Sequence, residues 1–217
     1  MCVNYRSLPA QTLQQYMNLP VIDSGWADEV WQDYAAPIVV TGERGDTEVL
    51  LASYGMVPKR KLPPGAKHYA TMNARAETVG QLKSYKTAWA RQYRCLVPMQ
   101  AFYEPCYESG RAERYRIAMA NETPFAVAGI WRPWAEEDGG YSFSFSQITV
   151  NADQHPLMRR MHKPGDEKRS LVIVARADYD GWLNAATPEE ARSLLRLPPD
   201  GALSARAAEP ARNASLF

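Results

Sequence analysis

The sequence predicts an α+β fold in which mainly antiparallel β-sheets form an open barrel-like core, with helices at its periphery. Short runs rich in β-branched and aromatic residues, divided by Gly, Pro, Asn and Asp, dominate residues 94–176. Segments with helical spacing are few and lie outside these runs. A length of 217 residues with 46% hydrophobic composition suits one domain with a buried core.

The first ninety residues predict two helices and one β-hairpin. Polar and apolar residues alternate with helical spacing at about 9–18. The runs PIVVTG (37–42) and TEVLLASYG (47–55) are separated by the turn-like GERGD, which indicates a hairpin. Thr78 is expected to cap a helix that continues through residues 79–92.

Six strands and a final helix are predicted in the rest of the chain. The strands are expected at 94–98, 100–107, 114–120, 125–131, 141–150 and 170–176. In TPEEARSLLR (187–196), Thr187 is the expected N-cap, with Pro188 at the first helical position and Glu190 completing a capping box. Residues 198–217 are rich in Ala, Pro and Arg, which predicts disorder. We therefore expect one domain at 1–197 and a flexible C-terminal segment at 198–217.

Composition narrows the classes of function. Lys and Arg number 25 against 24 Asp and Glu, so binding of an anionic partner needs a local basic patch. The sequence has no apolar run long enough to span a bilayer and no signal-peptide pattern, which predicts a cytoplasmic protein that binds no membrane. Three cysteines without CxxC spacing argue against a disulfide framework and a zinc site. Nucleotide-binding and standard hydrolase motifs are missing, so neither a cofactor nor a metal is expected.

Cys2 stands immediately behind the initiator Met1. Because cysteine is small, aminopeptidases are expected to remove Met1 and leave a mature N-terminus with both a thiol and an α-amine. These groups titrate near pH ~8.5 and ~8, so part of each is nucleophilic at neutral pH. A 1,2-aminothiol condenses with an aldehyde to a Schiff base and then to a thiazolidine. On this stretch alone, a chance second residue remains the simpler interpretation.

Other candidate residues lie in structured contexts. In TMNARAET, an extended backbone would turn Asn73, Arg75 and Glu77 to one side, although alternating polar residues commonly form a solvated face. Glu104 lies in an apolar run, where a buried carboxyl has a partner or a raised pKa suited to acid–base chemistry. His162, in a loop before an apolar strand, is either a proton shuttle or an ordinary surface residue.

Basic residues gather in two loop-like segments. The first, PKRKLPPGAK, holds Lys59, Arg60 and Lys61; the second, RRMHKPGDEKR, holds Arg160. Such segments suit contacts with a phosphate backbone, although solvation is the usual explanation of a charge run.

These segments together resemble the SRAP family (SOS response-associated peptidases, the abasic-site-processing proteins). The chain begins Met-Cys, residues 73–78 read NARAET and residues 95–104 read CLVPMQAFYE. AVAGIW (126–131), SFSQITVNAD (144–153) and MHKP (161–164) follow in the family's order. Departures occur at Asn4, where many members have Arg, and at Tyr54 and Arg60, which replace tryptophans. These departures predict an altered DNA-facing surface.

The resemblance implies a function and a role for each residue. Cys2 would capture the ring-opened aldehyde of an abasic site in single-stranded DNA as a covalent thiazolidine crosslink, which shields the lesion during the DNA damage response. Glu104 would act as general acid and base, His162 would promote opening of the sugar, and Asn73 would orient the amine or the sugar. Arg75 would hold a phosphate, and Lys59, Arg60, Lys61 and Arg160 would add DNA contacts. Removal of Met1 by autoproteolysis and a lyase-like side activity are also implied.

Two other functions remain open. A cysteine peptidase would use the thiol of Cys2 with His162 and Glu104, and would not need the α-amine. A non-covalent module for single-stranded DNA would bind without Cys2. A monomer is expected, since it would leave a DNA groove open.

Overall fold

The computed structural model describes residues 2–20 and 25–210, and its core is a closed barrel of five strands. The strands are β3 (Ala35–Thr41), β4 (Thr47–Tyr54), β9 (Tyr141–Asn151), β8 (Phe125–Ala135) and β6 (Arg94–Cys106). Each pairs with the next, and β6 returns to β3. Among these barrel pairs, only β4–β9 is parallel. The predicted barrel-like core is confirmed, but the barrel is closed rather than open, and the fold is mainly β rather than α+β.

The remaining described strands extend this sheet outside the barrel. They are β1 (Asn4–Ser7), β2 (Glu29–Val30), β5 (Asn73–Arg75), β7 (Glu113–Met119), β10 (Arg169–Leu171), β11 (Ile173–Val174) and β12 (Leu203–Ala207). Strand β12 pairs with β7 over its whole length. The disorder predicted for the C-terminal segment is therefore wrong for residues 203–207, where backbone pairing outweighs composition. Residues 211–217 lie outside the described part of the chain.

Strand boundaries differ from the prediction at prolines. The predicted strands 94–98 and 100–107 are one strand, β6, which runs through Pro98 and Pro105. Proline cannot donate to a sheet ladder, so it is tolerated where a neighbour is missing. One edge of β6 pairs with β3 as far as Leu96 and with β1 from Met99 onward. Pro98 lies in the gap between these two partners. The predicted strand 170–176 is divided into β10 and β11, which pair with β9 and β8.

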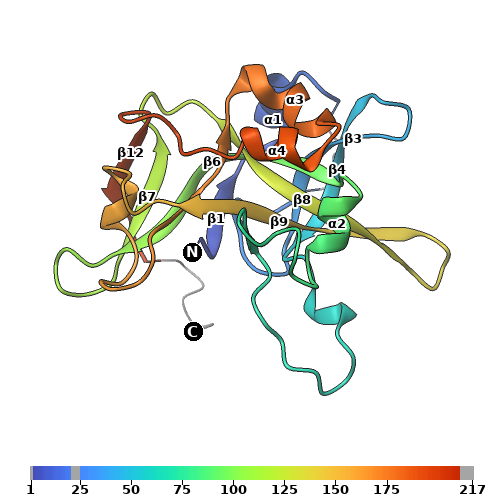
Figure 1. Cartoon of the computed structure of the whole chain (residues 1–217), viewed down its shortest axis with the longest axis horizontal. Coiled ribbons are helices and arrows are strands. Elements are labelled where there is room, and N and C mark those ends of the chain that lie inside the picture. Colours follow the sequence, from blue (N-terminus) through green and yellow to red (C-terminus); the bar gives the residue numbers. More distant parts are fainter. Residues whose placement is uncertain (1, 21–24, 211–217) are drawn as a thin grey trace.

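The helices are short and lie outside the barrel. They are α1 (Ala10–Met17), α2 (Lys86–Ala90), α3 (Tyr179–Asn184) and α4 (Pro188–Ser193). Single 3-10 turns occur at η1 (Lys59–Lys61), η2 (Met158–Arg160) and η3 (Arg176–Asp178). In Figure 1, α1, α3 and α4 gather at the top of the molecule, and α2 lies lower on the right. None of the described helices is long and apolar enough to span a bilayer.

Two helix predictions are confirmed and one is wrong in extent. Helix α1 agrees with the prediction, and α4 has its N-cap at Thr187, whose Oγ1 accepts the Glu190 N–H at 3.1 Å. The helix predicted at 79–92 is restricted to α2, and Thr78 does not cap it. Residues 78–85 form successive turns instead, in which Gly80 packs closely against Trp89. Tertiary packing and the poor helix propensity of glycine explain the difference.

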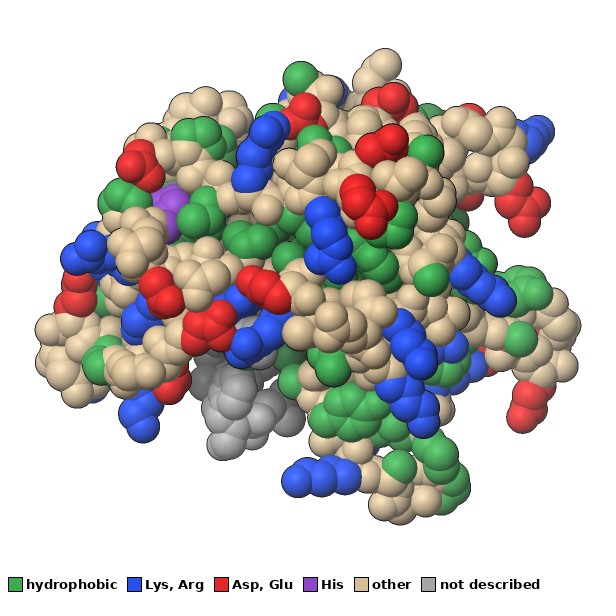
Figure 2. All heavy atoms as spheres, in the orientation of Figure 1, with side chains coloured by type: hydrophobic (Ala, Val, Ile, Leu, Met, Phe, Trp, Pro, Cys, Tyr) green, Lys and Arg blue, Asp and Glu red, His purple; other side chains and the backbone are tan. Residues whose placement is uncertain are grey.

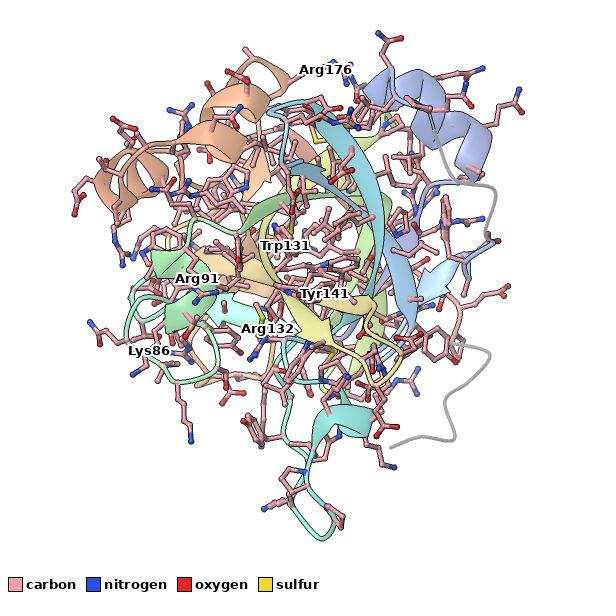
Figure 3. All side chains as sticks on the ribbon, turned by 90° about the vertical axis from the view of Figure 1, so that its right-hand side faces the viewer. Lys86, Arg91, Trp131, Arg132, Tyr141 and Arg176 are labelled. Atoms are coloured by element: carbon pink, nitrogen blue, oxygen red, sulfur yellow. The ribbon has the colours of Figure 1, made fainter. Side chains whose placement is uncertain are left out.

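The alternation of strand residues divides the core in two. Ile38 and Val40 of β3 belong to a cluster with Phe145, while Val39 between them belongs to a second cluster with Trp182. Successive strand residues face opposite sides of a sheet, so one cluster fills the barrel and the other packs under the helices. Figure 3 shows Trp131 of β8 amid the strands.

Gly129 provides a test of this packing. On β8, a Cβ at this position would lie 2.7 Å from Cys95 Sγ and 3.0 Å from the Ser146 carbonyl oxygen. We expect Gly129→Ala to lower the free energy of unfolding by about 1–3 kcal/mol, because the barrel must shift to accept the methyl group. Gly181→Ala is the control, since its Cβ would meet only Leu194 at 3.8 Å. Urea denaturation measures both; equal stabilities would contradict the close packing.

Candidate active site around Cys2

Cys2 is completely buried and lies two residues before β1. The β1–β6 pair places Asn4 opposite Tyr103, which brings Cys2 beside the part of β6 that carries Glu104. The Cys2 thiol donates a hydrogen bond to the Asn4 carbonyl oxygen at 3.2 Å. Burial, and then the negative charge of Glu104, raise the pKa of the thiol well above its ordinary value. The thiol is therefore protonated in the resting protein.

The backbone of Cys2 is held by side chains from two other strands. Asn73 Nδ2, on β5, donates to the Cys2 carbonyl oxygen at 2.6 Å. The Tyr54 hydroxyl, at the end of β4, lies 3.3 Å from the same oxygen and 3.0 Å from Oε1 of the buried Gln147. The Tyr85 hydroxyl donates to the Asn73 carbonyl oxygen at 3.1 Å. These bonds fix the N-terminal segment against the barrel.

Glu104 and His162 form a buried pair close to Cys2. His162 Nδ1 lies 3.3 Å from Glu104 Oε2, and the two side chains are only 6% and 3% exposed. Burial raises the pKa of Glu104 to about 7. Burial also lowers the pKa of His162 to about 4. At neutral pH the imidazole is thus uncharged, while the carboxyl is poised between its acid and its anion.

The position of one hydrogen follows from the neighbours of His162. Its Nε2 lies 3.0 Å from the Arg169 carbonyl oxygen, and a carbonyl only accepts, so Nε2 carries the ring hydrogen. Nδ1 then has a lone pair directed at Glu104. A hydrogen bond between them requires the protonated carboxyl, which agrees with the raised pKa of Glu104. Near neutral pH the site therefore holds Glu104 partly as the acid and partly as the anion, close to a buried thiol.

The His162 loop is fixed by its backbone and by Arg169. His162 adopts a left-handed conformation with φ 65°, uncommon for a residue with a side chain, and its N–H donates to the Pro105 carbonyl oxygen at 2.7 Å. Arg169 is 2% exposed and binds both oxygens of Glu77 and one of Glu167. This clamp joins the His162 loop to the segment that follows β5.

Most of the predicted DNA-contacting cations have an acidic partner. Arg75 pairs with Glu167 at 2.7 Å, and Arg160 makes a two-pronged pair with Glu108. The η1 cations Arg60 and Lys61 both pair with Glu136. Lys59 makes no ion pair with any described residue. Figure 2 accordingly shows basic and acidic side chains interspersed rather than a continuous basic face. The DNA-contact role of these five residues stays a prediction.

The structure brings together all four residues predicted as catalytic: Cys2, Asn73, Glu104 and His162. The sequence did not reveal that four further residues support this site: Tyr54, Gln147, Tyr85 and Arg169. Tyr54 carried a signal, because it stands where the family has tryptophan; the other three lie in ordinary strand or loop contexts. Within residues 2–20 and 25–210, no group of three or more His, Cys, Asp or Glu could hold a metal ion.

The fold is a β-barrel, and its candidate site combines a buried cysteine at residue 2 with a buried carboxyl–imidazole pair. The family model of the SOS response associated peptidase (SRAP) matches residues 1–214, and the chain belongs to this family. The family's description connects the protein with the response to DNA damage and with a peptidase-like class.

Solved structures share the fold. A Bordetella bronchiseptica protein has a TM-score of 0.84 and 29% identity, with 96% of this chain and 100% of that chain covered. A Bacteroides thetaiotaomicron protein has a TM-score of 0.77 at 20% identity, covering 96% and 92%. A phage-related protein of Bordetella bronchiseptica has a TM-score of 0.66 at 19% identity, covering 96% and 94%. No curated protein matches the chain.

Proposed function

We propose that this protein captures the aldehyde of abasic sites in single-stranded DNA through Cys2, after removal of Met1, and so shields the lesion. The observation that carries the proposal is the buried thiol of the second residue beside a carboxyl with a pKa of about 7. An aminothiol and an acid–base group are the two components that thiazolidine formation needs.

The chemistry can be written with atoms and protons balanced. The Cys2 amine adds to the aldehyde carbon and gives a carbinolamine. The Glu104 acid protonates the carbinolamine hydroxyl, which leaves as one water and yields an iminium ion. The positive iminium lowers the pKa of the adjacent thiol, whose proton returns to the Glu104 carboxylate. The thiolate then closes the five-membered ring, so the net reaction releases only water.

The surrounding residues serve this sequence of steps. Asn73 and Tyr54 hold the Cys2 carbonyl, which limits the orientations of the amine and the thiol. His162 receives or returns the Glu104 proton through Nδ1, and it can assist opening of the deoxyribose.

A general cysteine peptidase is the second candidate, favoured by the family's name. Such enzymes activate the thiol as a thiolate of lowered pKa beside a histidine. Here the pKa of the Cys2 thiol is raised, and its hydrogen bond goes to the Asn4 carbonyl oxygen. Both observations favour capture of an aldehyde over attack on peptide bonds.

The test uses protein with a free Cys2 amine and an oligonucleotide with one abasic site. We expect a heat-stable, slower band on a denaturing gel, and none with an intact oligonucleotide. A matched protein with an N-terminal extension that cannot be removed is expected to give no band, because its amine is blocked. Absence of the band with the free amine, or an equal band with the extended protein, would contradict the proposal.

The hydrogen bond of Tyr54 to Cys2 predicts a kinetic effect. Tyr54→Phe is expected to slow crosslinking by about 3- to 10-fold at saturating DNA, which is the worth of one hydrogen bond. Tyr5→Phe is a matched control, because Tyr5 is equally buried, packs edge-on against Tyr54 and has a hydroxyl without a hydrogen-bond partner in the described part of the chain. Single-turnover gels measure both rates. Equal rates for the two variants would exclude a positioning role for Tyr54.

A further inference from the structure

A small cleft between α2 and β8 has two arginines among its lining residues, and no carboxylate is among those described. Its volume is about 70 Å³, and the lining residues are Ser84, Thr87, Ala88, Arg91, Tyr93, Arg132 and Pro133. Figure 3 shows Arg91 and Arg132 on the same side of the molecule, with Lys86 close by. Two arginines and three hydroxyl-bearing residues therefore contribute to one small space, whose exposed lining is otherwise mostly apolar.

The two arginines differ from the other cations considered for DNA contact. Arg75, Arg60 and Arg160 are neutralised by glutamates. Among the described residues, neither Arg91 nor Arg132 forms an ion pair. The Arg132 guanidinium lies 3.8 Å from the centre of the Trp134 ring, and burial lowers its pKa. Arg91 is exposed, but Arg132 is partly buried without a counter-ion among the described residues, which is costly. An anion in the cleft would relieve that cost.

The size of the cleft suits a compact anion. At roughly 10–15 Å³ for each water-sized sphere, its volume holds about five heavy atoms, the number in a phosphate group. The planar fork of an arginine matches the geometry of phosphate oxygens, which it can bind with two parallel hydrogen bonds. A larger cavity of about 470 Å³, beside β1 and β2, is lined by three carboxylates and two arginines and has no excess of positive charge.

We propose that this cleft binds a phosphate group, supplied by the backbone of the DNA strand whose lesion reaches Cys2. That the phosphate belongs to this DNA strand rests on the proposed function. That the cleft binds an anion is independent of the proposed function. Tyr85 lies between the cleft residues Ser84 and Thr87, and its hydroxyl binds the Asn73 backbone. Asn73 in turn binds Cys2. A phosphate in the cleft would thus be held by the same segment that supports the nucleophile.

The test measures non-covalent binding, so that it is independent of aldehyde capture. A Cys2→Ala protein is titrated against a fluorescent single-stranded oligonucleotide without an abasic site, at several salt concentrations. For single strands, the slope of log affinity against log salt decreases by about 0.7 for each phosphate that the protein no longer binds. We expect that decrease, with weaker binding, in Arg91→Gln/Arg132→Gln. Arg132→Lys, which keeps the charge, should retain the slope. Arg196→Gln, at a paired and exposed arginine, is the matched control.

A second arm separates the sources of phosphate. Inorganic phosphate is titrated by calorimetry into the Cys2→Ala protein and into the double variant. Phosphate binding that disappears in the double variant, together with the change in DNA slope, supports the proposal in full. If phosphate binding disappears while the DNA slope stays unchanged, the cleft is a small-anion site and the DNA strand is rejected as its source. Unchanged binding of both ligands would overturn the cleft as an anion site. If the double variant changes the salt slope but the protein with a free Cys2 forms no crosslink, the result would contradict the proposed function and leave the phosphate site supported.

Discussion

Replacing Cys2 by serine is expected to abolish the heat-stable crosslink to abasic DNA. Serine keeps the α-amine, so a Schiff base still forms, but its hydroxyl does not close a stable sulfur-containing ring. The Schiff base can be trapped with borohydride, whereas the thiazolidine of the wild type needs no reductant. Denaturing gels with and without borohydride, with Met1 removal verified by mass spectrometry, measure the two products.

Cys106→Ser provides the matched control for Cys2→Ser. Cys106 is also buried and lies near Glu104 on β6, but its thiol donates to the Arg160 carbonyl oxygen, at 3.7 Å. A serine hydroxyl can also donate to this oxygen, so the control should crosslink like the wild type. If Cys2→Ser also gave a full yield of crosslink without borohydride, the thiol would have no part in the product.

Replacing Glu104 by glutamine is expected to slow crosslinking by about 100-fold or more, the usual contribution of a positioned general acid or base. The amide is similar in size and can still donate toward His162 Nδ1, but it cannot transfer a proton. Single-turnover rates at saturating DNA isolate this effect from affinity. A Glu108→Gln variant, which changes an exposed carboxylate on the same chain segment, should retain the wild-type rate.

The pH profile tests the role of Glu104 in a second way. Below about pH 7, Glu104 is the acid that the dehydration step needs; above it, the acid is lost. The α-amine is protonated, and therefore inactive, below its pKa of ~8. As the pH is raised, the wild-type rate should therefore increase, pass through a maximum between the pKa values of Glu104 and the α-amine, and then decrease. In Glu104→Gln, the fall above pH 7 should disappear and the slow rate should rise to a plateau. An unchanged profile would assign the proton transfer to another group.

Particular residues show what the sequence could predict of the fold. Short β-rich runs and the turn residues between them predicted the hairpin of β3 and β4 and most strands of the barrel. Closure could not be predicted, because it depends on the parallel β4–β9 pair, which joins segments about ninety residues apart. The helix predicted at 79–92 is wrong in extent because Gly80 is a poor helix former and packs against Trp89. Strand β12 could not be predicted either, because it forms by pairing with the edge of β7.

For the candidate site, the sequence predicted the central residues but not the contacts that support them. The resemblance of Met1-Cys2, NARAET and CLVPMQAFYE to the family's segments predicted Cys2, Asn73 and Glu104, for which the residue types alone left simpler interpretations open. The structure places the three residues together. Their supporting contacts could not be read from the sequence, since Gln147 and Arg169 act only through tertiary neighbours.

The same limit applies to the surface charges. Nothing along the chain shows that Arg75, Arg60 and Arg160 are paired with glutamates. Nor does it show that Arg91 and Arg132 have no such partner among the described residues. Charge patterns in a sequence do not reveal which partners the fold supplies.

Mass spectrometry of the crosslinked peptide tests the capture of an aldehyde by Cys2 most directly. After digestion of the protein and the DNA, we predict a fragment that begins at Cys2 and carries the deoxyribose remnant. Its mass should equal the sum of the two parts minus one water. Neither borohydride nor a thiol-alkylating reagent should change that mass, because both the amine and the sulfur are bonded to the former aldehyde carbon. A remnant attached to a lysine, or a Cys2 thiol that is still free to be alkylated, would contradict capture by the aminothiol.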